Sequence, residues 1–494
     1  MSKLYVFGIG GTGARVIKSL IHLLASGVKM EKNITTVVPI LIDPDNGNGD
    51  LTRTMRLLSL YKELQTKVDR NKGFFSTSIQ TLNDLTNAGV TINNQFKMLD
   101  VNAAQNQKFR SFIGHGSLSK ESQSLMELLF SEDNLNADMS VGFKGNPNIG
   151  SIVLNQFKNS PEYKVFTSSF SQGDSIFVIS SIFGGTGAAG FPLLLRNLRK
   201  VDPNIPGSDN VASAPIGALS MMPYFKVNEP DDSNKKTIDS GTFMGKAKAA
   251  LSHYSTSIFQ NNEIDAFYTL GEDAGNFYEH NDGQASQRNN AHFLELAAAT
   301  SIIDFTLTKN QLPRSNDLQR HTHFREFGIK EDTRNLNFKT LGDSFRNTIM
   351  TPLSQFYLMS LFNKNVKMRP DYFAKSPWYI HLNPVYSNDG LHEKYLKEFE
   401  THFIEWFDEM KNNDVSFHPF KESPNYNALL NFINEYDSKG GILNSFLNNK
   451  DHGDKFQKTL NTSHKKFQSS NDLGKDFLIL FEEATEKQIA SVIK

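Results

Sequence analysis

Residues 180–190 read S-S-I-F-G-G-T-G-A-A-G, and this stretch decides the fold. The residues before it, S-I-F-V-I-S at 175–180, form a short apolar run of the kind that a parallel sheet buries on both faces. The residues after it, from 191 to 198, repeat apolar side chains at helical spacing. The stretch is therefore predicted to be a tight loop between a buried strand and a helix.

The chemistry of this loop is that of a phosphate site. Glycines have no side chain, so the backbone N–H groups can approach an anion closely, and a threonine hydroxyl can donate a hydrogen bond to a phosphate oxygen. The beginning of a helix also favours negative charge. The residues predicted to contact phosphate here are Gly184, Gly185, Thr186 and Gly187.

A second glycine cluster, G-I-G-G-T-G at residues 8–13, stands in the same context, after an apolar run at 4–9 and before a helical pattern at 14–24. Its predicted phosphate ligands are Gly10, Gly11, Thr12 and Gly13. A dinucleotide-binding oxidoreductase would use one such loop, with an acid such as Asp43 on the ribose. Two phosphate loops on one sheet favour a triphosphate instead. The lysine-centred G-x-x-x-x-G-K-[ST] loop is absent.

Further apolar runs extend the pattern. Strands are predicted at 34–42, 214–222 and 264–270, with a helix near 245–257. Residues 291–305 carry apolar side chains on nearly every face, which predicts a buried helix. Alternating strands and helices indicate an α/β fold with a Rossmann-like, mostly parallel sheet and helices on both faces.

The chain of 494 residues is too long for one ordinary core. We expect a nucleotide-binding domain at 1–288 with an insertion or elaboration at 51–135. A long central core helix at 289–308 and a mainly helical C-terminal domain at 309–494 follow. The helices expected in that domain include 344–362 and an amphipathic one at 475–494, which packs on its own chain or on a neighbour.

Composition narrows the class of protein. The chain has 52 basic and 53 acidic residues, and this balance gives no signal for nucleic-acid binding. It has no cysteine, so disulfides and thiolate metal sites are excluded. The N-terminal residues lack the pattern of a secretory signal, and no apolar run reaches the roughly 18 residues of a membrane span. We expect a cytoplasmic protein.

The glycine loops resemble those of the tubulin/FtsZ superfamily, whose first loop reads G-x-G-G-x-G and whose signature loop reads G-G-T-G-[SA]-G. Between them, G-F-K-G-N-P-N-I-G at 142–150 is similar to the G-x-G-A-N-P-x-x-G loop that approaches the terminal phosphate in FtsZ. This resemblance implies two more phosphate ligands, Gly145 and Asn146. It also implies GTP or GDP as the ligand, together with Mg²⁺.

The resemblance covers residues 1–307 and extends to the sugar and the base. D-P-D-N at 43–46, M-P-Y-F at 222–225 and I-D-A-F-Y-T-L-G-E-D at 264–273 are similar to the family's strand ends. A carboxylate at Glu272, where the family has Asn, could accept both donors on one edge of guanine, which favours GTP over ATP. His292 is either a ligand or a polar residue satisfied at a helix start. The ribose or base residues implied are Asp45, Glu229, Glu272, Asn289, Asn290 and Phe293.

The sequence departs from the family at Phe183 and Ala189 in the signature loop, and at Arg15, where FtsZ has Asn. The family's catalytic loop, N-x-D-x-x-D, follows the central helix and acts on the next subunit's nucleotide. Here the candidate acids are Asp317 and Asp343, because Asn337 replaces the acid in the better copy.

No metal site made by protein side chains is expected. His321 and His323 lack an apparent third ligand, so a solvated turn is the favoured interpretation of that stretch.

Three functions remain open. The leading hypothesis is a tubulin-like GTP-binding protein of bacterial or phage type that assembles head to tail with nucleotide at the subunit interface, with GTP hydrolysis undecided. The second is a non-polymerising GTP-dependent sensor that docks a protein partner through its C-terminal helices. The third is an NAD-dependent oxidoreductase.

Overall fold

The structure is a computed structural model. It describes residues 2–45, 47–68, 73–86, 92, 97–98, 108–139, 143, 146–227, 240–272, 277–278, 284–312, 321–329, 333–421, 425–434, 452–466 and 472–492.

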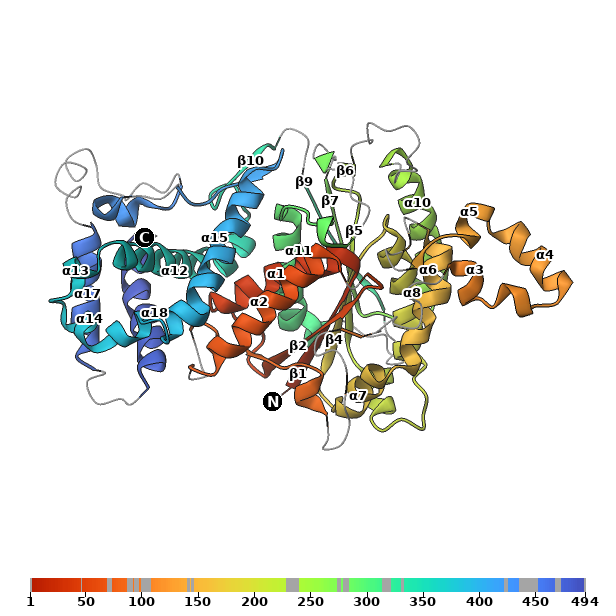
Figure 1. Ribbon diagram of the computed structural model, residues 1–494, viewed down its shortest axis with the longest axis horizontal. Coiled ribbons are helices and arrows are strands. Elements are labelled where there is room, and N and C mark those ends of the chain that lie inside the picture. The colour runs from red at the N-terminus through yellow and green to blue at the C-terminus, as the bar shows by residue number, and fades with distance from the viewer. Residues whose placement is uncertain are drawn as a thin grey trace.

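A single parallel sheet forms the centre of the molecule (Figure 1). It has seven strands in the order β3-β2-β1-β4-β5-β7-β9, and each neighbouring pair is parallel. This is the usual order of a doubly wound sheet, extended by one strand, and it confirms the predicted α/β class. The bounds are Ser2–Ile9 (β1), Ile34–Ile42 (β2), Ser78–Ile79 (β3), Ser175–Ser181 (β4), Ile216–Met221 (β5), Ala266–Glu272 (β7) and His323–Ile329 (β9).

Strands β1 and β4 lie side by side, with Leu4 opposite Ser175 and Gly8 opposite Ile179. The chain order of the strands reverses between these two, since β2 and β3 lie on one side and β5, β7 and β9 on the other. Open α/β sheets bind ligands at such a reversal, beyond the carboxyl ends of the strands. Both glycine loops begin there.

Helices cover both faces of the sheet (Figure 1). One face carries α1, α2 and α11, and the other carries α6, α8 and α10, with α7 and α9 nearby. The bounds are Gly10–Ala25 (α1), Gly49–Gln65 (α2), Pro147–Leu154 (α6), Pro161–Ser169 (α7), Gly185–Arg199 (α8), Ser208–Ser213 (α9), Phe243–Tyr254 (α10) and Phe293–Thr308 (α11).

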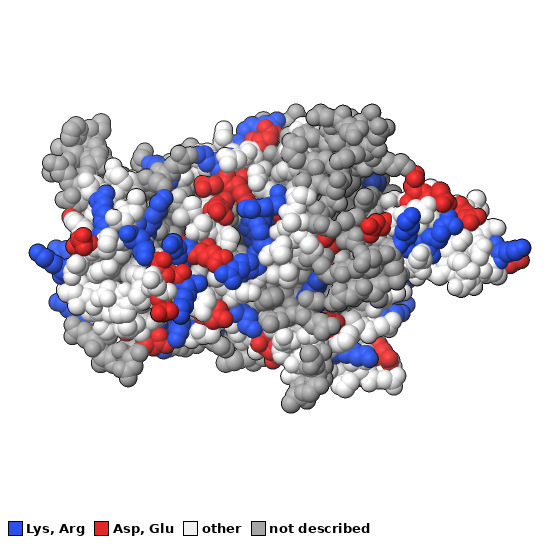
Figure 2. Space-filling view, viewed as in Figure 1, with Lys and Arg blue, Asp and Glu red and all other residues white. Residues whose placement is uncertain are grey.

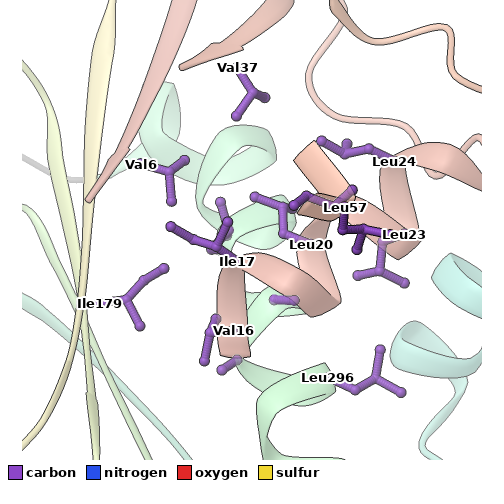
Figure 3. Packing of buried hydrophobic residues seen from close by; sticks show 14 of the residues in the cluster. Val6, Val16, Ile17, Leu20, Leu23, Leu24, Val37, Leu57, Ile179 and Leu296 are labelled. Atoms are coloured by element: carbon purple, nitrogen blue, oxygen red, sulfur yellow. The ribbon is translucent and has the colours of Figure 1, made fainter. Parts of the chain in front are cut away.

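Aliphatic side chains fill the space between the sheet and the first face of helices (Figure 3). Val6 and Ile179 project from β1 and β4 toward Ile17 and Leu20 of α1, and Leu296 reaches the same cluster from α11. Most side chains of α11 are buried, which confirms the predicted buried helix.

The stretch expected to be an insertion, 51–135, contains parts of different kinds. Helix α2 packs on α1 and belongs to the core. Residues 108–139 form a projection at one end of the molecule (Figure 1), built from the short helices Phe109–Phe112 (α3), Lys120–Leu129 (α4) and Glu132–Leu135 (α5).

The C-terminal region is mainly helical, as predicted, and packs at the opposite end (Figure 1). Its last helix, α18, packs on α12 and α17 of the same chain. A small parallel pair, β10 and β11, completes the region. The bounds are Asn335–Leu336 (β10), Asp343–Met368 (α12), Pro370–Phe373 (α13), Pro377–Leu382 (α14), Lys397–Lys411 (α15), Ser416–Phe417 (β11), His452–His464 (α17) and Leu473–Val492 (α18).

Strand β9 was not expected. Its residues H-F-R-E-F-G-I are mostly exposed on both faces, because β9 is the edge strand of the sheet. The interpretation of residues 321–323 as a solvated turn is therefore wrong at His323, which pairs with Ala266 of β7. In the part of the chain that the structure describes, no helix is long and apolar enough to span a membrane.

Candidate functional site

The two glycine loops touch each other beyond β1 and β4. A Cβ atom placed on Gly10 would lie 3.5 Å from the Cβ of Thr186 and 3.8 Å from the backbone nitrogen of Gly187. Gly10 also has a φ of +72°, a conformation that glycine adopts without strain. The sheet order thus brings together loops that are more than 170 residues apart in sequence.

The third loop joins them through helix α6. Asn146 is the N-cap of α6, and a Cβ on Gly150 would lie 2.8 Å from Ala189 Cβ and 3.2 Å from the carbonyl oxygen of Gly185. Gly145 lies outside the described residues. Three segments predicted to contact phosphate therefore converge at one edge of the sheet.

Helices α1, α6 and α8 all begin at this edge without a side-chain cap. Their N-cap residues, Ile9, Asn146 and Gly184, accept no backbone hydrogen bond through a side chain, and none of the three helices has an acid in its first turn. By contrast, Asn48 caps α2 and His292 caps α11. Uncapped first turns leave N–H groups and the positive end of the helix dipole available to an anion.

Packing alone requires a glycine at some of these positions, and at one of them it leaves room for a side chain. A Cβ on Gly13 would lie 2.5 Å from the carbonyl carbon of Gly8, and one on Gly187 would lie 2.6 Å from the carbonyl oxygen of Ser181. Around Gly11 the nearest atom, on Arg15, is 3.6 Å away, which is ordinary contact. The fold therefore does not require a glycine at position 11. A ligand that approached the backbone closely would require one.

Arg15 lies directly behind this loop in a buried network of charges. Its Nη1 contacts Asp50 Oδ2 at 2.5 Å, its Nε contacts Glu295 Oε1 at 2.5 Å, and its Nη2 donates to the Tyr224 hydroxyl at 2.7 Å. Burial alone would lower the pKa of Arg15, but Tyr224, Glu295 and Asp50 outweigh it and hold that pKa well above its ordinary value. The guanidinium is thus a fixed positive charge beside the first glycine loop.

The network continues into the C-terminal region through Glu409 of α15. Its carboxylate contacts Arg53 at 2.6 Å and Lys18 at 3.0 Å, and it accepts the backbone N–H of Ala291 at 2.8 Å. Arg53 in turn contacts Asp50 at 3.0 Å. The C-terminal region is therefore connected by ion pairs to the residues that surround the phosphate loops.

The residues expected at the base contact other residues of the chain. Glu272 Oε1 lies 3.0 Å from His292 Nε2, and the other ring nitrogen of His292 accepts the N–H of Leu294. His292 is thus the cap of α11, which is one of its two predicted roles. The backbone of Asn289 contacts Asp50 and Arg53, and the carbonyl of Asn290 accepts the Tyr278 hydroxyl.

The burial of Phe293 argues against its predicted contact with the base. Its ring is fully buried against Phe327, Phe345 and Phe417, with centroids 4.9 Å from Phe417. The first position of α11 faces the C-terminal region, where the ring is packed among other apolar side chains. This ring therefore has no face available to stack on a base.

The acids after β2 are buried as well. Asp45 donates its backbone N–H to Asp43 Oδ1, and its own carboxylate accepts the N–H of Gly47. Burial raises the pKa of Asp43 to about 7 against the opposing charge of Lys97. Glu229 lies outside the described residues.

The two candidate catalytic acids differ in place. Asp343 begins α12 close to Phe345, whose ring lies 5.8 Å from Phe293 at the start of α11. Asp343 therefore lies near the start of α11, because β9 intervenes between α11 and α12, and not in the segment that directly follows α11. Asp317 belongs to the segment between α11 and β9 and lies outside the described residues.

Sequence reasoning missed the partners of Arg15. Asp50 and Glu295 stand 35 and 280 positions away from it. The available signal was Arg15 itself, a charge within the apolar pattern of a helix that is almost entirely buried.

A cavity of about 880 Å³ lies away from this site, between α7 and the residues that follow α8. It includes none of the glycine loops.

Comparisons with known proteins give little further information. No protein-family model matches the chain, and no curated protein matches it. Among solved structures, CetZ2 from Haloferax volcanii, titled a GTPgS bound protofilament, aligns at 12% identity over 64% of this chain and 60% of its own, with a TM-score of 0.28. CetZ from Methanosaeta thermophila strain DSM 6194 aligns at 16% identity over 63% and 53%, with a TM-score of 0.22.

The chain thus spans less than two thirds of either neighbour. Superpositions with such low scores carry no weight for the fold or the function, which rest on the sheet order and the loops.

Proposed function

We propose that this chain is a tubulin-like GTP-binding protein. The observation that carries the proposal is the convergence of three uncapped helix starts, those of α1, α6 and α8, at the point where the strand order reverses. One helix start suits one phosphate group, and three segments around one point suit a polyphosphate. Its phosphate ligands would be Gly10, Gly11, Thr12, Gly13, Gly145, Asn146, Gly184, Gly185, Thr186 and Gly187.

Guanine would be recognised at the start of α11. Glu272 offers a carboxylate that two adjacent donors of guanine can share, and Asn289 and Asn290 offer amide groups. Because Glu272 contacts His292, nucleotide binding on this proposal replaces that contact with one to the base. Asp45 and Glu229 are the proposed ribose contacts.

Mg²⁺ would be held mainly by the phosphates. Mg²⁺ in nucleotide sites is commonly bound through one or two carboxylates and the substrate.

Head-to-tail assembly would place the loop after α11 against the phosphates of the next copy. Helix α11 begins beside the network at the phosphate edge and ends near Ser175, the first residue of β4, which Lys309 contacts. It therefore runs from one edge of the sheet to the other. Asp317 is the proposed water-positioning acid, so hydrolysis would need a neighbouring copy.

A second candidate, a non-polymerising sensor, is favoured by Glu409. This residue links the C-terminal region to the start of α11, so a structural change at the base site would be transmitted to α15. A partner docked on the C-terminal helices would then respond to the bound nucleotide.

A thermal-shift panel with GTP, GDP, ATP and NAD⁺, each with Mg²⁺, tests the proposal. GTP and GDP should raise the melting temperature more than ATP does. Stabilisation by NAD⁺ alone would favour the oxidoreductase, and stabilisation by none of them would contradict nucleotide binding.

Gly11→Ala gives the matched test of the site. The fold tolerates a Cβ there, so the melting temperature without ligand should be unchanged, while GTP affinity should fall by about tenfold, or about 1.4 kcal/mol. Gly116→Ala is the control, since it meets no atom within 4 Å and lies in the projection.

Sedimentation with GTP against GDP separates the two assembly hypotheses. Pelletable polymer that forms with GTP supports head-to-tail assembly. Tight GTP binding without polymer at high protein concentration supports the sensor.

A further inference from the structure

The residues just before α11 belong to no helix or strand. Asn289, Asn290 and Ala291 lie between the loop at 284–288 and His292, which caps α11. Backbone N–H and C=O groups inside a protein are nearly always hydrogen-bonded, so the partners of these groups decide the shape of such a segment. Two of the three residues are proposed base contacts. Whatever fixes this segment therefore shapes the base site.

Side chains of the central domain hold the first two residues of the segment. The N–H of Asn289 donates to Asp50 at 3.1 Å, and its carbonyl oxygen accepts from Arg53 at 2.6 Å. The carbonyl oxygen of Asn290 accepts from the Tyr278 hydroxyl at 3.2 Å. Asp50 and Arg53 both belong to α2. This part of the segment is therefore held by the domain that carries the glycine loops.

The third residue, Ala291, is held by the C-terminal region. Its N–H donates to the carboxylate of Glu409, in the last turn of α15, at 2.8 Å. Its carbonyl oxygen accepts from the side-chain amide of Asn413, just after α15, at 2.7 Å. The same amide nitrogen lies 3.2 Å from the carbonyl oxygen of Glu409. Both backbone groups of Ala291 are thus bonded to side chains at the end of one helix.

Helix α15 is itself fixed against α2. Figure 2 shows acidic and basic side chains close together where these two helices lie. Both nitrogens of an arginine fork, on Arg56 of α2, contact the carboxylate of Glu398 of α15 at the surface. Arg53 contacts Glu409 at 2.6 Å in the more buried network. Paired contacts of this kind have a defined geometry, so the side chains that reach Ala291 extend from a rigid support.

The side chains of the segment remain available to a ligand. In the part of the chain that the structure describes, the amide groups of Asn289 and Asn290 have no hydrogen-bond partner, although the backbones of both residues are bonded. Asn289 is half-buried and Asn290 is exposed. A fixed backbone that presents free polar side chains is the arrangement of a preorganised binding site.

We propose that Glu409 and Asn413 are positioning residues for the nucleotide base. By holding Ala291, they set the backbone on which Asn289 and Asn290 meet the base, and this inference rests on the proposed function. The C-terminal region, which contains none of the predicted phosphate ligands, then determines how well the site distinguishes guanine from adenine. Binding of the phosphates belongs to the glycine loops and does not depend on these two side chains.

Asn413→Asp tests this role with little change in side-chain shape. The carboxylate has no N–H to donate to the Ala291 carbonyl, so the segment should shift. Affinities for GTP, ATP and inorganic tripolyphosphate, each with Mg²⁺, are measured by titration calorimetry. The ratio of GTP affinity to ATP affinity should fall by about fivefold, as expected for one lost hydrogen bond, while the affinity for tripolyphosphate should stay unchanged.

Asn412→Asp is the matched control. It makes the same change of charge one position earlier, at the exposed residue that ends α15. Its ratio of GTP affinity to ATP affinity should equal that of the natural protein. Asn413→Ala removes the donor without adding a charge and should lower the ratio in the same direction. It replaces Asn413→Asp if that variant melts at a lower temperature than the control without nucleotide.

The possible failures are distinguishable. An unchanged ratio in Asn413→Asp and Asn413→Ala would overturn the inference and leave the proposed function standing. An equal loss of affinity for GTP, ATP and tripolyphosphate would also overturn it, because Asn413 would then support the whole site and not the base. A natural protein that binds GTP no better than ATP would contradict guanine recognition itself and the inference with it.

Discussion

The C-terminal region and the projection at 108–139 are both additions to the central sheet, and they are attached in opposite ways. The C-terminal region meets α1 and α2 through buried rings and buried ion pairs. The projection ends in a helix without a single buried residue. The difference indicates that the first addition packs as part of the central domain, whereas α4 of the second contributes no buried side chain.

The buried contact of the C-terminal region centres on His22 and Trp406. Their rings are stacked with centroids 4.8 Å apart, and Phe399 and Phe403 meet the same imidazole edge-on. Burial lowers the pKa of His22 well below its ordinary value, so the ring is neutral and packs as an aromatic side chain. Glu409 then adds two ion pairs one helical turn along α15.

The ion pairs of the projection are of the exposed kind. Arg110 contacts Glu132, whose side chain is 71% exposed, and His115 contacts Glu127, which is 52% exposed. Such pairs contribute little to stability. Four variants test the two additions and the sheet edge between them.

Trp406→Ala should have the largest effect. It removes a fully buried indole from between α1 and α15, and the free energy of unfolding should fall by about 3–5 kcal/mol. Chemical denaturation measures this. An effect below about 1 kcal/mol would show that the C-terminal region is an independent unit.

Glu409→Gln should come second, with a loss of about 2–3 kcal/mol near neutral pH, since hydrogen bonds to charged groups are worth about that much. Burial would raise the pKa of Glu409, but Lys18 and Arg53 outweigh it and lower that pKa. Its contribution is therefore present above the ordinary glutamate pKa and is lost as the pH falls below it. The loss should shrink in acid, and a loss independent of pH would exclude the ion pairs as its cause.

Asp43→Asn should have an intermediate effect of opposite sign, at the sheet edge that belongs to neither addition. Because burial raises the pKa of Asp43 to about 7, the folded state holds a proton that the unfolded state releases, and stability falls as the pH rises from the ordinary aspartate pKa to about 7. The stability of the variant relative to that of the natural protein should therefore rise by about 2–3 kcal/mol between about pH 5 and pH 8. A difference in unfolding free energy between the variant and the natural protein that is the same at about pH 5 and about pH 8 would contradict the raised pKa.

Leu125→Ser combined with Leu128→Ser should have the smallest effect on stability, within about 0.5 kcal/mol, since both side chains are at least half exposed. Chemical denaturation of the double variant beside the natural protein measures this difference. A large loss of stability would show that these side chains are packed within their own chain.

Much of the site could be predicted because its signals are local. The strand, loop and helix around Gly184–Gly187, the loop at Gly10–Gly13 and the buried helix α11 each follow from periodicity and from glycines within about 20 residues. The α/β class then follows from their alternation. That the phosphate loops bind a nucleotide stays a prediction.

The partners of Arg15, the burial of Phe293 and the place of Asp343 depend on residues far apart in the chain. Strand β9 escaped detection because an edge strand with an exposed face lacks the apolar run that marks the inner strands.

The positions of the glycine loops and the residues in them follow from the sequence alone, since a loop of glycines needs only its own backbone to fold. Only the tertiary structure decided that three such loops meet, and that a buried arginine with two carboxylates lies behind them. The tertiary structure also buries Trp406 between the C-terminal region and the central domain, and it leaves Leu128 of the projection exposed to solvent. The physical reason is that burial and charge pairing are properties of neighbours in space, and neighbours are set by the order of strands in the sheet.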